Sequence, residues 1–280
     1  MTTAFVLSGG ASLGSVEVGM LLALAEAGIT PDLIVGTSVG AVNGGWVASR
    51  PDAAGIGELA DVWRSVSRGD VFPVRPLFGL MGFLGQRSSF VPAGGLRRLL
   101  RRHLEFARLE EAPIPLHVVA TDVLSGHDVL LSSGDAVDAI AASAAIPAVL
   151  PPVKVGGRDL MDGGVVNNTP LSHAVELGAE TVYVLPTGSA CALTKPPQGA
   201  LAMALHALTL AINQRLASDI RRLEAAVDLR VVPPLCPVNV SPIDFSQGSS
   251  LIDRAHAQTK GWLAHPPAKG QAVLLAPHRH

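Results

Sequence analysis

The chain has 280 residues, and its 21 lysines and arginines against 23 aspartates and glutamates leave a formal net charge of −2. A nearly neutral chain lacks the basic surface of a general polyanion binder, so we expect no nucleic acid partner. Hydrophobic residues make up 48% of the chain and charged residues only 16%, which excludes a disordered protein.

The order of the elements predicts an α/β fold. Apolar, β-branched runs alternate with longer helical patterns, which is typical of βαβ units around a mostly parallel sheet. In chain order, we expect strands at 4–7, 33–35, 116–121, 127–131, 181–185 and 229–232. We expect helices at 15–27, 39–49, 56–66, 96–104, 136–144, 171–177, 200–226 and 249–263. These elements fit a single domain over 1–280, with a motif-bearing core at about 4–187 and a C-terminal helical region at about 199–265.

Neither a targeting signal nor a metal-binding spacing is visible. The N-terminus enters an apolar segment without a basic region or a cleavage site, so no signal peptide is expected. The apolar run 200–212 is too short for a transmembrane helix. Cys191 and Cys236 have no zinc-type spacing. The sequence favours a cytoplasmic protein without cofactors or metals, and its low charge allows peripheral contact with a membrane.

The sharpest local motif is Gly36-Thr37-Ser38-Val39-Gly40, which follows the strand at 33–35 and opens the helix at 39–49. A strand, a sharp turn and a helix form the setting of a nucleophile elbow, in which the serine hydroxyl is exposed at the end of the sheet. Gly36 and Gly40 leave room for close packing of strand and helix. The alternative is a glycine-rich turn in which Ser38 only caps the helix.

A second motif, Ser8-Gly9-Gly10-Ala11-Ser12-Leu13-Gly14, joins the first strand to the first helix. It lacks the spacing of a dinucleotide-binding loop and the Gly-Lys-Ser/Thr ending of a phosphate loop. It remains a small-residue loop whose backbone N–H groups, chiefly those of Gly10 and Ala11, can converge with that of Val39 on an oxyanion. We call residues 8–14 the glycine-rich loop.

A serine nucleophile needs a base. None of the nine histidines lies in a recognisable context for a catalytic triad. Asp162 in Met161-Asp162-Gly163-Gly164 is the other candidate, because Gly156-Gly157 suggests a tight hairpin that presents it at its end. The alternative is a plain Asp-Gly turn.

Together these elements resemble the patatin-like phospholipase family. The resemblance covers most of the chain from Ala4 to about Leu185. It is carried by four blocks in order: the glycine-rich loop, the elbow at Ser38, the run 142–147 with Pro151-Pro152-Val153, and Asp162-Gly163-Gly164 with Asn167-Asn168-Thr169-Pro170.

The resemblance implies a three-layer α/β/α sandwich and hydrolysis of fatty-acyl esters of phospholipids or related lipids, with no cofactor. It implies a Ser-Asp dyad in which Ser38 is the nucleophile and Asp162 the base. The implied oxyanion hole consists of Gly9, Gly10, Ala11 and Val39. The implied supporting glycines are Gly14, Gly36, Gly40, Gly163 and Gly164.

The glycine-rich loop departs from the family pattern, because Ala11 stands where a third glycine is typical and Leu13 where a basic residue is typical. The backbone N–H of Ala11 remains if its φ is accessible to a residue with a Cβ. Two alternatives therefore stay open. One is a patatin-like lipid-binding protein with weak or no activity, and the other is a histidine-assisted esterase or acyltransferase.

Two further segments bear on the lipid substrate. The stretch 70–95 is rich in Gly, Pro and Phe, and we interpret it as a wall or lid for an acyl chain. The run Arg97-Arg98-Leu99-Leu100-Arg101-Arg102-His103 is a basic amphipathic pattern that can rest on an anionic membrane. The alternative for this run is the solvated face of an ordinary helix. The head group, the acyl length and the oligomeric state are not indicated.

Overall fold

The computed structural model describes residues 1–73, 89–92, 94–188, 196, 198–236, 238, 240–242 and 244–265. In these residues the strands are β1 (Thr3–Leu7), β2 (Leu33–Thr37), β3 (Leu116–Asp122), β4 (Asp128–Leu131), β5 (Val153–Val155), β6 (Arg158–Asp162), β7 (Thr181–Leu185) and β8 (Asp228–Val231). The α-helices are α1 (Gly14–Glu26), α2 (Val39–Val47), α3 (Ala53–Ser65), α4 (Arg68–Val71), α6 (Gly94–His103), α7 (Ala136–Ser143), α8 (Leu171–Glu176), α9 (Ala200–Leu223) and α10 (Gly248–Ala264). All predicted strands and helices are present, the hairpin expected at Gly156-Gly157 is confirmed as β5 and β6 with Asp162 at its end, and α4 is additional.

The strands form one eight-stranded mixed sheet in the order β5-β6-β3-β2-β1-β7-β8, and β4 pairs with β3 beside this path. The strands β3, β2, β1, β7 and β8 are parallel neighbours. Antiparallel pairing adds β4 and the β5–β6 hairpin at one side. Parallel neighbours need long crossovers, which the helices supply. The expected mostly parallel sheet is confirmed.

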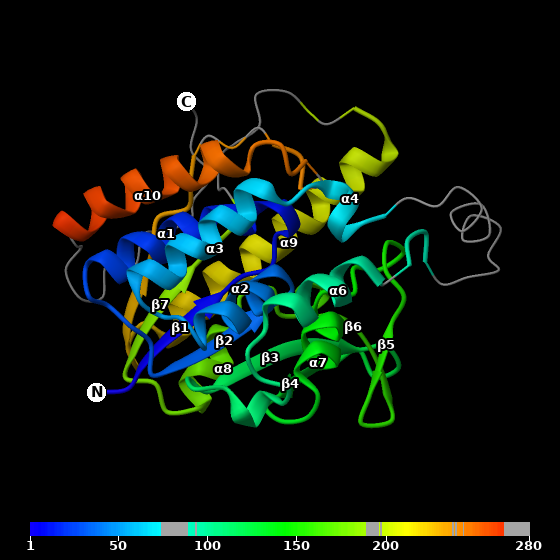
Figure 1. Ribbon diagram of the computed structural model, residues 1–280, viewed down its shortest axis with the longest axis horizontal. Helices are drawn as coiled ribbons and strands as arrows, with labels where there is room; N and C mark the ends of the chain where they lie inside the picture. The colour runs from blue at the N-terminus through cyan, green and yellow to red at the C-terminus, as the bar shows by residue number, and fades with distance from the viewer. Residues whose placement is uncertain are drawn as a thin grey trace.

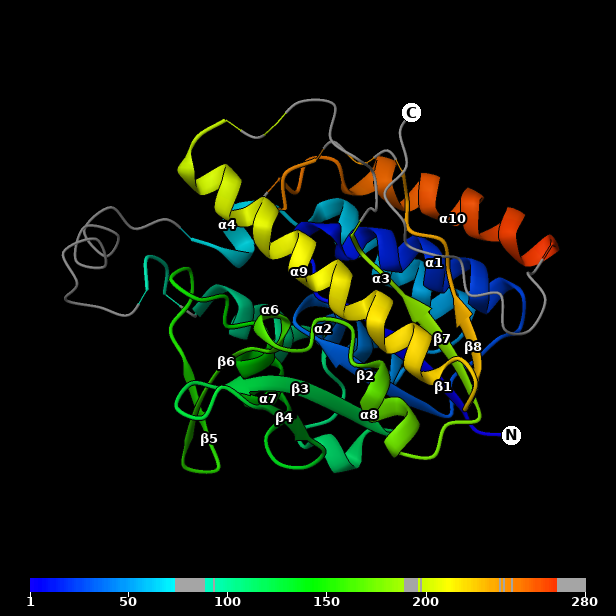
Figure 2. The ribbon, with the colours of Figure 1, turned by 180° about the vertical axis from the view of Figure 1, so that it is seen from behind.

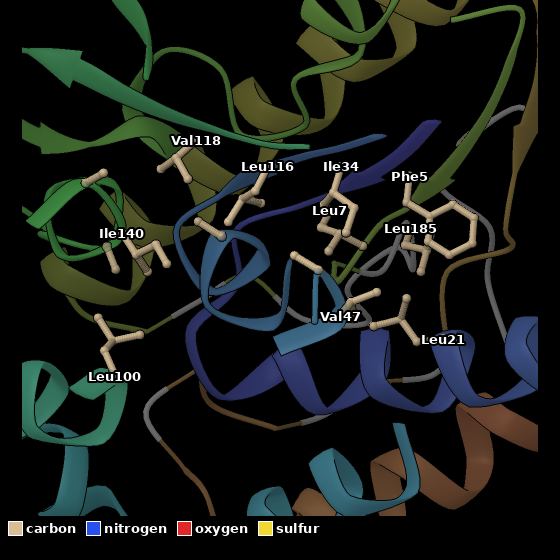
Figure 3. Close-up of a cluster of buried hydrophobic side chains, with 14 of the residues drawn as sticks. Phe5, Leu7, Leu21, Ile34, Val47, Leu100, Leu116, Val118, Ile140 and Leu185 are labelled. Carbon is tan, nitrogen blue, oxygen red and sulfur yellow. The ribbon is translucent and has the colours of Figure 1, made fainter. Parts of the chain in front are cut away.

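The central strands bury side chains on both faces. In β1, Ala4 and Val6 join the apolar cluster that contains residues of α8 and α9, whereas Phe5 and Leu7 join the cluster that contains residues of α1 and α2. This alternation follows from the period of two in a strand. Figure 1 shows α1, α3 and α10 over one face of the sheet, Figure 2 shows α9 crossing the other, and Figure 3 shows part of the core beside α1. The fold is therefore the expected three-layer α/β/α sandwich.

The sheet register brings the predicted motifs to one end of the sheet. Leu7 pairs with Gly36, so the glycine-rich loop and the elbow leave adjacent strands side by side. On β3, Val119 pairs with Thr37 on one side and the next residue, Ala120, pairs with Asp162 on the other. Because β3 lies between β2 and β6, Asp162 comes to the same end of the sheet as the elbow. Ligands of α/β sheets characteristically bind at this carboxyl end.

The stretch 70–95 is described only at its ends, because residues 74–88 and 93 lie outside the described residues. At its start, α4 ends at Val71, and the buried ring of Phe72 contacts the ring of Phe245 edge-on at 6.1 Å between centroids.

In the C-terminal region, α10 lies along α1 (Figure 1) and buries Leu251 and Ala255 in the core. In the part of the chain that the structure describes, no helix is long and apolar enough to cross a membrane.

Candidate active site

Ser38 occupies a strained turn between β2 and α2. Its backbone has φ 55° and ψ −121°, in a region that residues with a Cβ rarely adopt. The turn is tight, because a Cβ on Gly36 would lie 2.6 Å from the carbonyl oxygen of Gly40. A Cβ on Gly40 would lie 2.3 Å from the carbonyl oxygen of Leu7. Only glycine fits these two positions, as expected for a nucleophile elbow.

The Ser38 hydroxyl does not cap α2, since the structure shows no side-chain capping bond there. Instead, its Oγ donates a hydrogen bond of 2.7 Å to Oδ2 of Asp162, 124 residues away in the chain. Both side chains are buried, at 5% and 6% exposure. The geometry thus brings together the two side chains that the sequence singled out and argues against a serine that serves only as a helix cap.

Asp162 is held in place by the surrounding backbone. Its second carboxylate oxygen accepts a bond of 2.7 Å from the N–H of Gly164, and its own N–H donates to the Ala145 carbonyl at 3.0 Å. Thr121 donates its hydroxyl to the Asp162 carbonyl at 3.0 Å. The side chain therefore does accept a bond of the kind found in an Asp-Gly turn. It also keeps one oxygen for Ser38.

Burial raises the pKa of Asp162 to about 6, although the hydrogen bonds from Ser38 and Gly164 act in the opposite direction. A carboxylate with this pKa is still ionised at neutral pH and is a stronger base than an exposed aspartate. No histidine takes part in the hydrogen bonds of Ser38 or Asp162 within the described residues. The geometry therefore favours the Ser-Asp pair over a histidine-assisted site.

The Ser38 backbone is fixed by a contact that the sequence analysis did not foresee. Its N–H donates to the hydroxyl of Ser143 at 2.8 Å, and Ser143 in turn donates to the carbonyl of Val119. Ser143 lies in the run 142–147 that contributed to the family resemblance, so the signal was present without a role attached to it. It ties the elbow to β3 and α7.

The glycine-rich loop is clamped at Gly9. The N–H of Gly9 donates to the Asn168 carbonyl at 3.0 Å. The carbonyl of Gly9 accepts from Nδ2 of Asn168 at 3.2 Å and from the Thr187 hydroxyl. The expectation that Gly9 contributes an oxyanion donor is therefore revised, because its N–H is already engaged. Asn168 and Thr187 are site residues that sequence reasoning missed, although Asn168 lies in a block of the resemblance.

Three of the expected oxyanion donors are available. Within the described residues, no group accepts a hydrogen bond from the N–H of Gly10, Ala11 or Val39. Ala11 adopts φ 51°, in the left-handed region that favours the glycine typical of the family, so alanine keeps its N–H in the loop at the cost of backbone strain. Leu13 packs against the main apolar cluster instead of presenting a charge.

An apolar cavity opens beside Ser38. Its walls come chiefly from α2, α3 and α6, and the end of α4 contributes Val71. The lining residues are Ala11, Ser38, Val39, Val42, Trp46, Leu59, Val62, Trp63, Val66, Val71, Phe72, Leu96, Leu99, Leu100, His103, Leu104, Ala144, Ile146, Leu150 and Phe245. The indole N–H groups of Trp46 and Trp63 donate to Gly55 and Asn43, so both are satisfied away from the cavity. The wall expected at 70–95 thus covers only a small part of the described lining. The apolar spacing on α2 and α3 was the signal that sequence analysis overlooked.

Comparisons with known proteins identify the family of the chain. The family model described as patatin-like phospholipase matches residues 5–175. Patatin-like phospholipase domain-containing protein 6 of Mus musculus is 31% identical over 190 residues, which cover 67% of this chain and 14% of that protein. An uncharacterized NTE family protein of Mycobacterium tuberculosis is 32% identical over 187 residues, covering 66% of this chain and 49% of that protein. The chain belongs to the patatin-like phospholipase family.

The chain spans only part of these relatives, about half of the mycobacterial protein and a seventh of the mouse one. Among solved structures, VipD from Legionella pneumophila aligns with 93% of this chain and 67% of its own, at 14% identity and a TM-score of 0.45.

Proposed function

We propose that this protein is a serine acyl hydrolase that cleaves fatty-acyl ester bonds of phospholipids or related lipids through an acyl-enzyme at Ser38. The observation that carries the proposal is the 2.7 Å hydrogen bond from Ser38 to Asp162 beside an apolar cavity. Membership of the patatin-like phospholipase family supports lipid hydrolysis in general terms.

In the first half of the reaction, Ser38 Oγ attacks the ester carbonyl while its proton passes to Asp162. The oxyanion that forms is stabilised by the N–H groups of Gly10, Ala11 and Val39, and each such donor is worth about 3 to 4 kcal/mol in comparable enzymes. Collapse of the intermediate breaks the ester bond. The leaving alcohol takes the proton from Asp162, and the acyl group stays on Ser38.

In the second half, Asp162 takes a proton from water as the water oxygen attacks the acyl-enzyme. The same N–H groups stabilise the second oxyanion. The ester bond to Ser38 then breaks, the proton returns to Ser38 Oγ, and the fatty acid leaves. The closed proton cycle between Ser38 and Asp162 needs no histidine.

The cavity favours a substrate with a long acyl chain. Among the described residues, His103 is the one ionisable side chain in the lining, and burial lowers the pKa of His103 so that the neutral form is favoured. Each Å² of an acyl chain that the cavity removes from water contributes roughly 25 cal/mol to the free energy of binding.

A related domain occurs in a protein of Kluyveromyces lactis named lysophospholipase NTE1, 30% identical over 193 residues that make up 12% of its length.

The helix α6 supplies a means of contact with a lipid surface. Its buried residues Leu96 and Leu100 line the cavity, whereas Arg98, Arg101 and Arg102 are exposed. The remaining arginine, Arg97, forms an ion pair with Asp138. We propose that the three exposed arginines bind anionic lipid next to the cavity, since a basic residue near such a surface contributes about 1 kcal/mol.

Changing Arg98, Arg101 and Arg102 together to glutamine tests this contact. We expect roughly a tenfold or greater loss of binding to anionic vesicles in a sedimentation assay, and little change with neutral vesicles. The control changes Arg221, Arg222 and Lys260 to glutamine and removes the same charge from α9 and α10. Equal binding by the wild type and the α6 variant would contradict the proposed contact.

The hydrolase itself is tested by labelling with a fluorophosphonate that bears a long alkyl chain, followed by peptide mass spectrometry. We expect an adduct on Ser38 in the wild type and none in Ser38→Ala. Absence of an adduct in the folded wild type would overturn the proposed hydrolase and favour the alternative of a lipid-binding protein without turnover.

A further inference from the structure

One buried carboxyl has no part in the proposed reaction. Glu17 lies in the first turn of α1 and is 0% exposed. Within the described residues it forms no ion pair with a basic side chain. A buried carboxyl costs free energy that an apolar side chain would not, unless its hydrogen bonds are satisfied. Its contacts therefore indicate what it does.

Glu17 holds the start of the glycine-rich loop. Its Oε1 accepts a hydrogen bond of 2.6 Å from the N–H of Ser8, the first residue of the loop. The same N–H has a second, longer contact of 3.4 Å to the Leu185 carbonyl on β7. The shorter bond to the carboxyl is the main attachment of Ser8 toward α1.

Asn43 on α2 extends the attachment to the other end of the loop. Its Nδ2 donates to Oε2 of Glu17 at 2.9 Å and to the carbonyl of Gly14, the last residue of the loop, at 3.1 Å. Its Oδ1 accepts from the indole N–H of Trp63 at 2.9 Å. Glu17 and Asn43 together therefore hold both ends of the glycine-rich loop, and Asn43 also supports a wall of the cavity.

The N–H groups of Gly10 and Ala11 lie between these two fixed ends. We propose that Glu17 is a positioning residue that holds the glycine-rich loop through Ser8 and Asn43, so that Gly10 and Ala11 present their N–H groups to the reacting carbonyl at Ser38. This inference rests on the proposed hydrolase function. Oxyanion donors contribute only when they are preorganised, so a small shift of the loop lowers the rate of the chemical step.

Burial also raises the pKa of Glu17 well above its usual value, whereas the hydrogen bonds from Asn43 and Ser8 act the other way. A side chain of this kind tolerates a neutral replacement better than an exposed glutamate would. Gln at this position keeps a carbonyl oxygen for the Ser8 N–H but places its NH₂ against the donating Nδ2 of Asn43, so it keeps one of the two attachments. Met has a similar length but no oxygen acceptor.

The experiment compares Glu17→Met and Glu17→Gln with the wild type. The first readout is the rate at which a short methyl fluorophosphonate labels Ser38, because a short reagent does not fill the acyl cavity. The second readout is the split between kcat and KM for a long-chain ester. Leu24→Ala, a buried change lower on α1, is the control for loss of stability alone.

In Glu17→Met we expect labelling and kcat to fall roughly 10- to 100-fold with KM within about twofold, and in Glu17→Gln to fall less than about fivefold. Leu24→Ala should lower the Tm without changing either rate. The proposal is overturned if the folded Met variant labels as fast as the wild type, or if its loss is no greater than that of Leu24→Ala.

Two further results are decisive. If Glu17→Met does not fold, Asn43→Ala takes its place and should slow labelling by the short reagent about 3- to 10-fold. An unchanged labelling rate in folded Asn43→Ala would overturn the proposal. If the wild type is not labelled at Ser38, the proposed hydrolase is overturned, and the role of Glu17 with it. If the wild type is labelled and neither Glu17→Met nor Asn43→Ala changes the labelling rate, only the role of Glu17 is overturned.

Discussion

Asp162 and Glu17 are two buried carboxyls with similar physics and different surroundings. Each accepts one hydrogen bond from a backbone N–H, and burial raises the pKa of each. The second oxygen of Asp162 meets a hydroxyl beside the cavity, whereas that of Glu17 meets the amide of Asn43 in the interior. The Ser38 hydroxyl can give its proton to Asp162 during a reaction, whereas the Asn43 amide keeps its protons. The side chain that each carboxyl meets thus separates the proposed base, Asp162, from the proposed positioning residue, Glu17.

The largest expected effect is on the base. In Asp162→Asn the side chain keeps its shape but cannot accept a proton, so we expect kcat to fall by roughly 10³-fold or more with little change in KM. Steady-state hydrolysis of a long-chain ester measures this. Asp219→Asn is a control, because Asp219 is a buried aspartate whose carboxylate pairs with Arg215 and Arg222 on α9. A kcat within tenfold of the wild type in Asp162→Asn would remove Asp162 from the role of base.

The pH profile sharpens the comparison. Asp162 acts as a base in its ionised form, so kcat/KM should rise with pH and reach half of its plateau near pH 6, the pKa of Asp162. In Glu17→Gln the plateau should fall slightly and the midpoint should stay within about 0.3 of a pH unit. A midpoint that disappears in Glu17→Gln would assign the titration to Glu17 instead.

The smallest expected effect is on stability. Between about pH 4 and pH 6 the folded protein keeps the proton on Asp162 while the unfolded chain has lost it, so this group makes stability fall as pH rises through that window. The raised pKa corresponds to at most about 3 kcal/mol above pH 6. Asp162→Asn removes this penalty and should raise the Tm at pH 7.5, with the gain vanishing below about pH 4.

Thermal unfolding over this pH range provides the test. A Tm of Asp162→Asn below that of the wild type at pH 7.5 would show that the carboxylate stabilises the fold, contrary to the raised pKa.

Much of the fold follows from local patterns in the chain. The central strands are short apolar runs that bury both faces, and the helices between them have clear periodicity. The hairpin at Gly156-Gly157 was predicted from its two glycines, but strand ranges for β5 and β6 were not, because Lys154, Arg158 and Asp159 interrupt their apolar pattern. They are strands because β6 finds a partner in β3, which is a non-local contact.

The candidate active site also has some parts that local sequence predicts and others that depend on contacts between distant residues. The elbow at Ser38 could be predicted because strand, turn and helix are contiguous in sequence. The hydrogen bonds between Gly9 and Asn168 could not be predicted, because the two residues are 159 positions apart in the chain. The sequence predicted a wall or lid at 70–95, of which 74–88 and 93 lie outside the described residues, whereas the described walls come largely from α2, α3 and α6. Side chains from separate helices make one surface only after those helices pack.

The sequence by itself determined the α/β class, the strained serine turn and the small-residue loop, because strand pattern, glycine content and turn geometry act over a few residues. Only the tertiary structure decided which carboxylate faces Ser38, which N–H groups stay free and where an acyl chain fits. The register of β3 between β2 and β6 sets the first of these, and the hydrogen bonds of Asn168, Thr187 and Glu17 to the glycine-rich loop set the second. Contacts of this range depend on how the whole sheet and its helices assemble, which no local pattern encodes.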